Sequence, residues 1–387
     1  MPPSRTVARL RPFASTIFAE MTALAVATDA VNLGQGFPDT DGPPAMLESA
    51  REAIAQGLNQ YSPGPGMPVL RRAVAADRER RFGLGYDPDS EVLVTVGATE
   101  AISATLLGLI EPGDEVLLIE PFYDSYAAAI ALAGATRTSV PLVADGAGWT
   151  VDTDALERAV GPRTRMLIVN SPHNPTGTVF DRATMVRIAE IATAHDLLVL
   201  TDEVYEHLVF DGGVHTPIAT LPGMFERTVT VSSAAKTFNA TGWKTGWALG
   251  PAALIDAVRA AKQFMSFVGG TPFQPAVAYA LEHEQAWIAA MRDGLQRKRD
   301  TLSAALSAAG ADVKHSAGTY FVCADIASFW RGDAYEFCRS LPQLVGVAAV
   351  PVTAFVDEPA QWTSLVRFAF CKQDEVLAEA AERLRKL

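Results

Sequence analysis

Short apolar runs alternate with longer amphipathic stretches over the first two thirds of the chain. The runs are continuously apolar and rich in β-branched residues, which is typical of strands covered by helices on both faces. The longer stretches predict helices through Leu109 and over residues 126–133 and 183–195. Strands are predicted at EVLVTVG (91–97), EVLLIE (115–120), RMLIVN (165–170), LLVLTDE (197–203), TVTVSS (228–233) and GWALG (246–250). This alternation predicts an α/β fold with a mainly parallel central sheet.

The pattern changes after about residue 280. A long helical stretch covers residues 285–309, and strands are predicted around Tyr320, Val347 and Val366. These elements indicate a second, smaller α/β unit that the N-terminal segment completes.

Length and composition agree with two globular units. The chain has 387 residues, 49% of them hydrophobic and 20% charged, so it exceeds the usual size of a single core and is not disordered. We expect a large domain over residues 44–283, and a small domain formed by residues 1–43 and 284–387.

Charge and cysteine content exclude several functions. A net charge of -12 argues against general binding to nucleic acid or to anionic membranes. The three cysteines are scattered without a CxxC pair, and the six histidines show no ligand spacing, so neither disulfides nor a metal site is expected. The N-terminal sequence MPPSRTVARLRPF lacks the apolar stretch of a signal peptide, and we therefore expect a cytoplasmic protein.

Polar and glycine-rich clusters follow the predicted strands. In open α/β sheets, ligands bind outside the carboxyl ends of the strands, so these clusters are expected to line one cleft. The clusters are GATEA (97–101), EPFYDSY (120–126), NSPHNPTG (170–177), TDEVYE (201–206) and SSAAK (232–236).

The lysine of SSAAK, Lys236, indicates a function only when it is considered together with other polar residues at the strand ends. By itself, Lys236 is best explained as a solvated side chain, and Asp202 serves equally well as the N-cap of the following turn. Together with Tyr205 and Asn174, however, they match the needs of pyridoxal phosphate. This cofactor requires an amine, a carboxylate at its ring nitrogen, donors to its phenolic oxygen and a phosphate cradle.

Motifs along nearly the whole chain carry a family resemblance. They are LGQGFPD, QYSPGPGMPVLR, EPFYDSY, NSPHNPTG, TDEVYE, SSAAKTFNATGWKTGW, AGTYF and LVRFAF. The sequence resembles class I aminotransferases of pyridoxal-phosphate fold type I, in the subgroup of N-succinyldiaminopimelate and kynurenine/glutamine aminotransferases. The resemblance implies that Lys236 forms the Schiff base, Asp202 pairs with the pyridinium nitrogen, and Tyr205 and Asn174 contact the phenolic oxygen.

The resemblance also implies the rest of the cofactor site. GATEA opens a helix whose N–H groups suit a phosphate, although a plain tight turn explains Gly97 equally well. Tyr123 is expected to stack on the cofactor ring, with Phe122 as the alternative. Tyr61 would reach the phosphate bound by a neighbouring subunit, which implies a homodimer with shared active sites. Four further residues are expected at the phosphate: Ala98, Thr99, Ser233 and Lys244.

Arg367 is a charged residue inside the apolar run LVRFAF, where an unpaired guanidinium is costly. An internal salt bridge would satisfy it, but in similar enzymes this arginine binds the substrate α-carboxylate, with Gly36 and Asn174 close by. His173 receives no role from the resemblance and is expected to be structural.

The predicted activity is ping-pong transamination between an amino acid and a 2-oxo acid, with Lys236 moving the proton. The stretch FVGGTPFQPAVA (267–278) favours N-succinyl-L,L-diaminopimelate with 2-oxoglutarate/glutamate, a reaction of lysine biosynthesis. A kynurenine/glutamine enzyme, acting on aromatic substrates or methionine, is the first alternative, for which Phe37, Tyr123 and Phe267 could form an aromatic pocket.

Two further alternatives remain. A cysteine-conjugate or cystathionine β-lyase would use the same residues, and a good leaving group at Cβ would distinguish it. A ligand-sensing transcription regulator is not expected, because LGQGFPD begins at Leu33 and leaves no room for a preceding DNA-binding domain.

Overall fold

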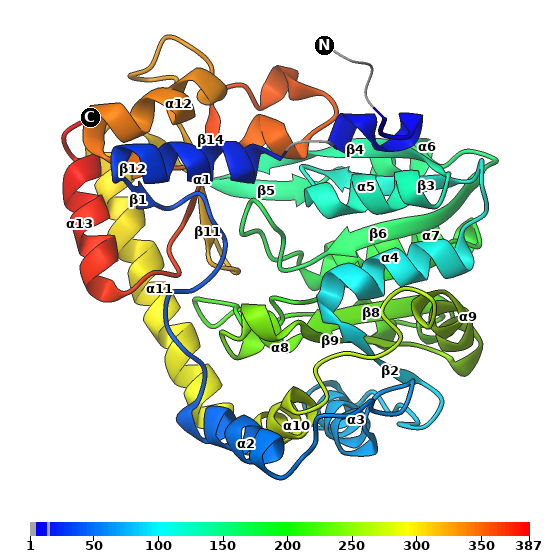
Figure 1. Cartoon of the computed structure of the whole chain (residues 1–387). Helices are drawn as coiled ribbons and strands as arrows, with labels where there is room; N and C mark the ends of the chain where they lie inside the picture. Colours follow the sequence, from blue (N-terminus) through cyan, green and yellow to red (C-terminus); the bar gives the residue numbers. More distant parts are fainter. Residues whose placement is uncertain (1–4, 14–15) are drawn as a thin grey trace.

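An eight-stranded sheet forms the centre of the larger part of the protein (Figure 1). The computed structural model describes residues 5–13 and 16–387, so residues 1–4 and 14–15 of the expected small domain lie outside it. The strand order is β2-β9-β8-β7-β6-β3-β4-β5. The strands are β2 (Val92–Val96), β3 (Glu115–Glu120), β4 (Thr136–Asp145), β5 (Gly148–Val151), β6 (Thr164–Asn170), β7 (Leu198–Asp202), β8 (Thr228–Ser233) and β9 (Thr245–Leu249).

The sheet is mainly parallel, as predicted. Strands β8, β7, β6, β3 and β4 run parallel to one another, whereas β9 is antiparallel to both of its neighbours and β5 is antiparallel to β4. Strands β4 and β5 were not predicted. The burial pattern of β4 is mixed because it lies near the sheet edge, so it lacks the continuous apolar run that marks the central strands.

Helices cover both faces of this sheet. In β3, Val116 and Leu118 belong to the core under α4 (Gly97–Leu109), α5 (Asp124–Leu132) and α9 (Ala252–Lys262). Leu117 and Ile119 belong to the opposite core, with α6 (Thr153–Arg158) and α7 (Arg182–Ala194). A third core lies at the β2 edge, with α2 (Pro44–Ala55), α3 (Pro68–Phe82) and α10 (Phe273–His283). Because helices cover both faces of the sheet, the strand sequences are continuously apolar and do not alternate between apolar and polar residues.

A second, antiparallel sheet lies at the other end of the molecule, in the order β10-β11-β14-β13. Its strands are β10 (Asp312–Val313), β11 (Phe321–Asp325), β13 (Val350–Pro351) and β14 (Leu365–Ala369). The helices around it are α1 (Ile17–Thr28), α11 (Gln285–Ala308), α12 (Ala334–Val345) and α13 (Asp374–Leu384). Strand β1 (Val31–Asn32) pairs in parallel with β12 (Val347–Ala348), so the N-terminal segment lies beside the C-terminal one.

The remaining features of the chain agree with this architecture. Cys323, Cys338 and Cys371 are buried free thiols, as expected for core residues. Among the described residues, no helix combines the length and apolar character needed to cross a membrane.

The contact between α4 and α9 gives a test of the packing. A β-carbon at Gly108 would overlap the carbonyl oxygen of Ala257, whereas one at Gly294 in α11 would meet nothing closer than an Arg297 nitrogen at 3.8 Å. We expect Gly108→Ala to lower the free energy of unfolding by about 1–3 kcal/mol through overpacking. Gly294→Ala should raise it by about 0.5–1 kcal/mol, because alanine loses less backbone entropy in a helix. Urea midpoints of the two variants check this, and equal shifts would contradict the packing described.

Candidate active site

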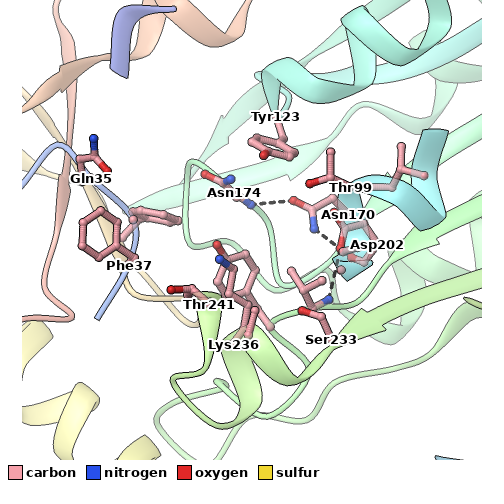
Figure 2. A pocket seen from close by; sticks show the side chains of 18 of the residues that line it. Gln35, Phe37, Thr99, Tyr123, Asn170, Asn174, Asp202, Ser233, Lys236 and Thr241 are labelled. Atoms are coloured by element: carbon pink, nitrogen blue, oxygen red, sulfur yellow. Dashed lines mark hydrogen bonds between the residues drawn. The ribbon is translucent and has the colours of Figure 1, made fainter. Parts of the chain in front are cut away.

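The clusters at the strand ends meet in one cavity of about 320 Å³ (Figure 2). Each predicted cluster contributes: Gly97, Ala98, Thr99, Tyr123, Asn170, Asn174, Asp202, Val204, Tyr205, Ser233, Ala235 and Lys236. The N-terminal loop adds Gln35, Gly36 and Phe37, and the second sheet adds Phe321 and Arg367. The cavity therefore lies between the carboxyl edge of the large sheet and the smaller sheet.

Lys236 lies in the short helix α8 (Ala234–Thr237), which begins directly after β8. This arrangement brings its side chain to the sheet edge, where the ammonium nitrogen lies 5.8 Å from the centre of the Tyr320 ring. Desolvation lowers the pKa of Lys236 to about 8, although Cys371 and Asp202 oppose the shift. About a tenth of the amine is therefore neutral at pH 7, far more than for an ordinary lysine, and the neutral form is the one that acts as a nucleophile or general base.

Asp202 is the last residue of β7 and is buried. Its Oδ2 accepts a hydrogen bond of 2.7 Å from the Tyr126 hydroxyl, and its Oδ1 accepts one of 3.2 Å from the Val204 N–H. Burial raises the pKa of Asp202, whereas these donors and Lys236 lower it. Asp202 thus caps the following turn and also lines the cavity, so the two interpretations of this residue are compatible.

Two polar residues around Asp202 were not predicted. Asn170 ends β6 in direct register with Asp202, and its Nδ2 donates to the Asp202 carbonyl at 2.8 Å while its Oδ1 accepts from the Asn174 N–H (Figure 2). Tyr126 follows Tyr123 by three residues, one helical turn along α5. Both lie in motifs that were recognised, and the register of neighbouring strands would have identified Asn170.

Another part of the cavity wall is built around Gly97. This residue has φ +74° and begins α4, and a β-carbon there would lie 3.2 Å from Lys244 Nζ. The Val96 side chain makes no capping hydrogen bond to α4, and the Glu100 carboxylate accepts from the Val96 N–H, so the first N–H groups within α4 remain available. These N–H groups, together with Lys244, suit an anion such as a phosphate. Ala98, Thr99 and Ser233 line the same cavity.

Arg367 is 1% exposed and stacks over the Phe321 ring at 4.0 Å. Its terminal nitrogens donate to Asn174 Oδ1 at 3.0 Å and to the Gly34 carbonyl at 2.8 Å. Within the described chain, no carboxylate lies at salt-bridge distance from this guanidinium and its Nε has no partner, so the internal salt bridge is not found. Burial lowers the pKa of Arg367, which indicates that an anionic ligand would stabilise it.

The other cavity residues differ in how they are held. The Gly36 carbonyl accepts from the Tyr320 hydroxyl at 2.5 Å, which fixes the N-terminal loop. Tyr205 is buried with its ring 5.2 Å from that of Tyr320, and burial raises its pKa, so its hydroxyl remains a hydrogen-bond donor. Tyr123 lines the cavity, whereas Phe122 is buried in the core beneath α5.

Three predicted or considered residues lie elsewhere. Tyr61 is 83% exposed and packs edge-on against Phe267 at 5.5 Å, and neither residue lines the cavity. His173 is buried with its Nδ1 2.8 Å from Thr176 Oγ1. Burial lowers the pKa of His173 to about 3, which keeps the ring neutral.

Comparison with known proteins identifies this arrangement. The chain belongs to the family described as aminotransferase class I and II, which it matches over residues 28–384. It is a transaminase of fold type I, as the motifs predicted. Members of this family generally depend on pyridoxal phosphate.

Among individual proteins, the chain is 62% identical to the probable N-succinyldiaminopimelate aminotransferase DapC of Mycobacterium tuberculosis, over 99% of this chain and 98% of that protein. It is 40% identical to the methionine aminotransferase of Escherichia coli, over 98% and 97% of the two chains. The solved structure of the Mycobacterium tuberculosis N-succinyldiaminopimelate aminotransferase superposes with a TM-score of 0.97 at 63% identity, covering 98% of this chain and 99% of that one.

Proposed function

We propose that this transaminase binds pyridoxal 5′-phosphate in the cavity and moves an amino group from an amino acid to a 2-oxo acid. The observation that carries the proposal is the convergence of an amine of lowered pKa, a buried carboxylate and an uncapped helix start in one cavity. The bound cofactor would supply a ring that withdraws electrons from the substrate Cα.

The residues of the cavity fit distinct parts of this cofactor. Lys236 would hold its aldehyde carbon and then take the proton from the substrate Cα. Asp202 would keep a proton on the ring nitrogen, because Tyr126 and Val204 hold its carboxylate in place. Asn174 Oδ1 is occupied by Arg367, which leaves its Nδ2 to donate, beside the Tyr205 hydroxyl, to the phenolic oxygen.

The remaining roles follow from position in the cavity. Tyr123 would stack on the ring, and the phosphate would be held by Ala98, Thr99, Ser233 and Lys244. Arg367 would bind the substrate carboxylate with its unpartnered Nε and terminal nitrogens, next to Gly36 and Asn174. We assign the cofactor-binding domain to residues 44–283 and the small domain to residues 1–43 and 284–387, with the enzyme in the cytoplasm.

For the substrate, we propose N-succinyl-L,L-diaminopimelate with 2-oxoglutarate/glutamate. The support is the 62% identity to the Mycobacterium tuberculosis protein, which exceeds the 40% identity to the methionine aminotransferase. The aromatic pocket of a kynurenine enzyme is only partly built by this subunit, because Phe37 and Tyr123 line the cavity and Phe267 does not. The β-lyase alternative uses the same residues and is tested with the same substrate panel.

The reactivity of Lys236 should depend on pH. Because only the neutral amine reacts, the rate at which cofactor-free protein captures pyridoxal phosphate should rise with pH around a midpoint near 8, the pKa to which desolvation lowers this side chain. Borohydride should then fix the cofactor to the peptide that contains Lys236. Lys236→Ala should lose turnover, with Lys314→Ala as the control, because Lys314 pairs with Asp312 and does not line the cavity. A labelled peptide elsewhere would refute the assignment.

We propose a homodimer with shared active sites, and the position of Tyr61 supports it. This side chain is exposed and outside its own cavity, so it is useful only if it reaches a second subunit. Mixing inactive Lys236→Ala chains with inactive Tyr61→Ala chains should restore part of the activity through hybrid dimers. Full activity in a protein that sediments at the 41.2 kDa chain mass would exclude shared sites.

Specificity is decided by comparing kcat/KM across substrates. We expect the succinylated substrate to be preferred over kynurenine, glutamine and methionine by at least about tenfold, equivalent to about 1.4 kcal/mol of transition-state binding. The panel includes cystathionine, with pyruvate release as the lyase readout. A preference for any other compound would overturn the substrate assignment and leave the transaminase class intact.

A further inference from the structure

A buried ionic cluster lies beside the active-site loop, outside the cavity. Arg78 of α3 is 2% exposed. Its Nη1 donates to Glu203 Oε2 at 2.9 Å, and its Nη2 donates to Glu206 Oε1 at 3.2 Å. Glu206 also accepts from Ser232 at 2.7 Å and from Arg81 at 2.7 Å. One guanidinium thus joins two carboxylates of the TDEVYE segment, and none of these three side chains lines the cavity.

The cluster and the cavity use interleaved residues of the same backbone. Asp202, Tyr205 and Ser233 line the cavity. Their chain neighbours Glu203, Glu206 and Ser232 instead join the cluster. Any shift of the two glutamates therefore moves the backbone that carries the cavity-lining aspartate and tyrosine.

Charge pairing keeps both carboxylates ionised. Burial opposes ionisation of Glu206, but attraction from Arg78 and Arg81 outweighs it and lowers the Glu206 pKa. Burial is likewise outweighed at Glu203, where His215, whose Nε2 lies 3.2 Å away, and Arg78 lower the pKa. The same two carboxylates raise the pKa of Arg78 against its burial.

Further groups face this cluster. Asp77 pairs with Arg81, the His207 ring nitrogen lies 3.0 Å from an Arg81 nitrogen, and the charge of Arg78 acts on the Tyr86 hydroxyl. Burying such a network contributes little net stability, because apolar residues of similar volume often do as well. Stability alone is therefore a weak reason for its presence beside the cavity.

We propose that Arg78 is a positioning residue of the active site, which holds Glu203 and Glu206 and thereby fixes Asp202 and Tyr205 relative to Lys236. The proposal rests on the proposed cofactor site. Arg78 touches neither cofactor nor substrate, so its effect is transmitted through the TDEVYE backbone and through the charge that it places beside the site.

The test compares Arg78→Met with Arg71→Met. Arg71 is a matched control because it lies on the same helix α3, is also buried, and pairs with Asp89 and with backbone carbonyls away from the TDEVYE segment. Each variant is prepared free of cofactor. Pyridoxal phosphate is then titrated in, and its Kd, the pH midpoint of its visible absorbance and the melting temperature of the cofactor-free protein are measured.

For Arg78→Met we expect Kd to rise about tenfold, the scale on which outer partners of a bound group act. The pH midpoint of the absorbance should move to a higher value. Without the Arg78 cation, the negative charge of Glu203 and Glu206 is no longer balanced, and this charge stabilises protonated, cationic groups nearby. Arg71→Met should lower the melting temperature without changing Kd or the midpoint. In Arg78→Lys, the retained positive charge should keep the absorbance midpoint at its wild-type pH. Because lysine cannot bridge Glu203 and Glu206 as the guanidinium does, Kd should remain higher than in the wild type.

Ser232→Ala removes one hydrogen bond to Glu206 and serves as the mild variant if Arg78→Met does not fold. We expect a smaller rise in Kd in the same direction. An unchanged Kd in Arg78→Met or, if that variant does not fold, in both Arg78→Lys and Ser232→Ala would overturn the positioning role, as would an equal rise in Kd in the Arg71 control. Failure of the wild-type protein to bind pyridoxal phosphate would instead refute the proposed cofactor site.

Discussion

The alignment of the carboxyl ends of β6, β7 and β8 is the constraint on which the rest of the site depends. Parallel pairing puts Asn170 in register with Asp202, and β8 delivers Ser233 and then Lys236 to the same edge. Because all three strands are buried on both faces, a one-residue slip would exchange side chains between two differently packed cores and leave overlaps and cavities. A sheet held by its hydrophobic cores thereby sets the positions of Asn170, Asp202 and Lys236 at one edge.

Much of this arrangement could be read from the sequence, because the signals are local. The central strands are continuous apolar runs, and the polar clusters that follow them do meet in one cavity. The edge strand β5 and its neighbour β4 were not predicted, because partly exposed strands lack a continuous run of apolar residues. The contact of Tyr126 with Asp202 joins residues 76 positions apart, and only the folded sheet brings them together.

Arg367 shows how a buried cation can be tolerated without a carboxylate partner among the described residues. The ring of Phe321 covers the face of the guanidinium, and Asn174 Oδ1 and the Gly34 carbonyl accept hydrogen bonds from its terminal nitrogens. Neutral acceptors orient the cation without neutralising it, so its charge remains available to a carboxylate. A carboxylate partner in the fold would have neutralised the guanidinium and competed with any anion that enters the cavity.

The pairing of β1 with β12 has a consequence for how the chain is made. Strand β1 and the loop that follows it are synthesised long before their partners: Val31 is in register with Val347, and the Leu33 carbonyl accepts from the Ala369 N–H. The large sheet is complete in sequence by Leu249 and can assemble while synthesis continues. The wall of the cavity that this loop and Arg367 form cannot assemble before β12 and β14 are made, which is later than the strand ends that carry Asp202 and Lys236.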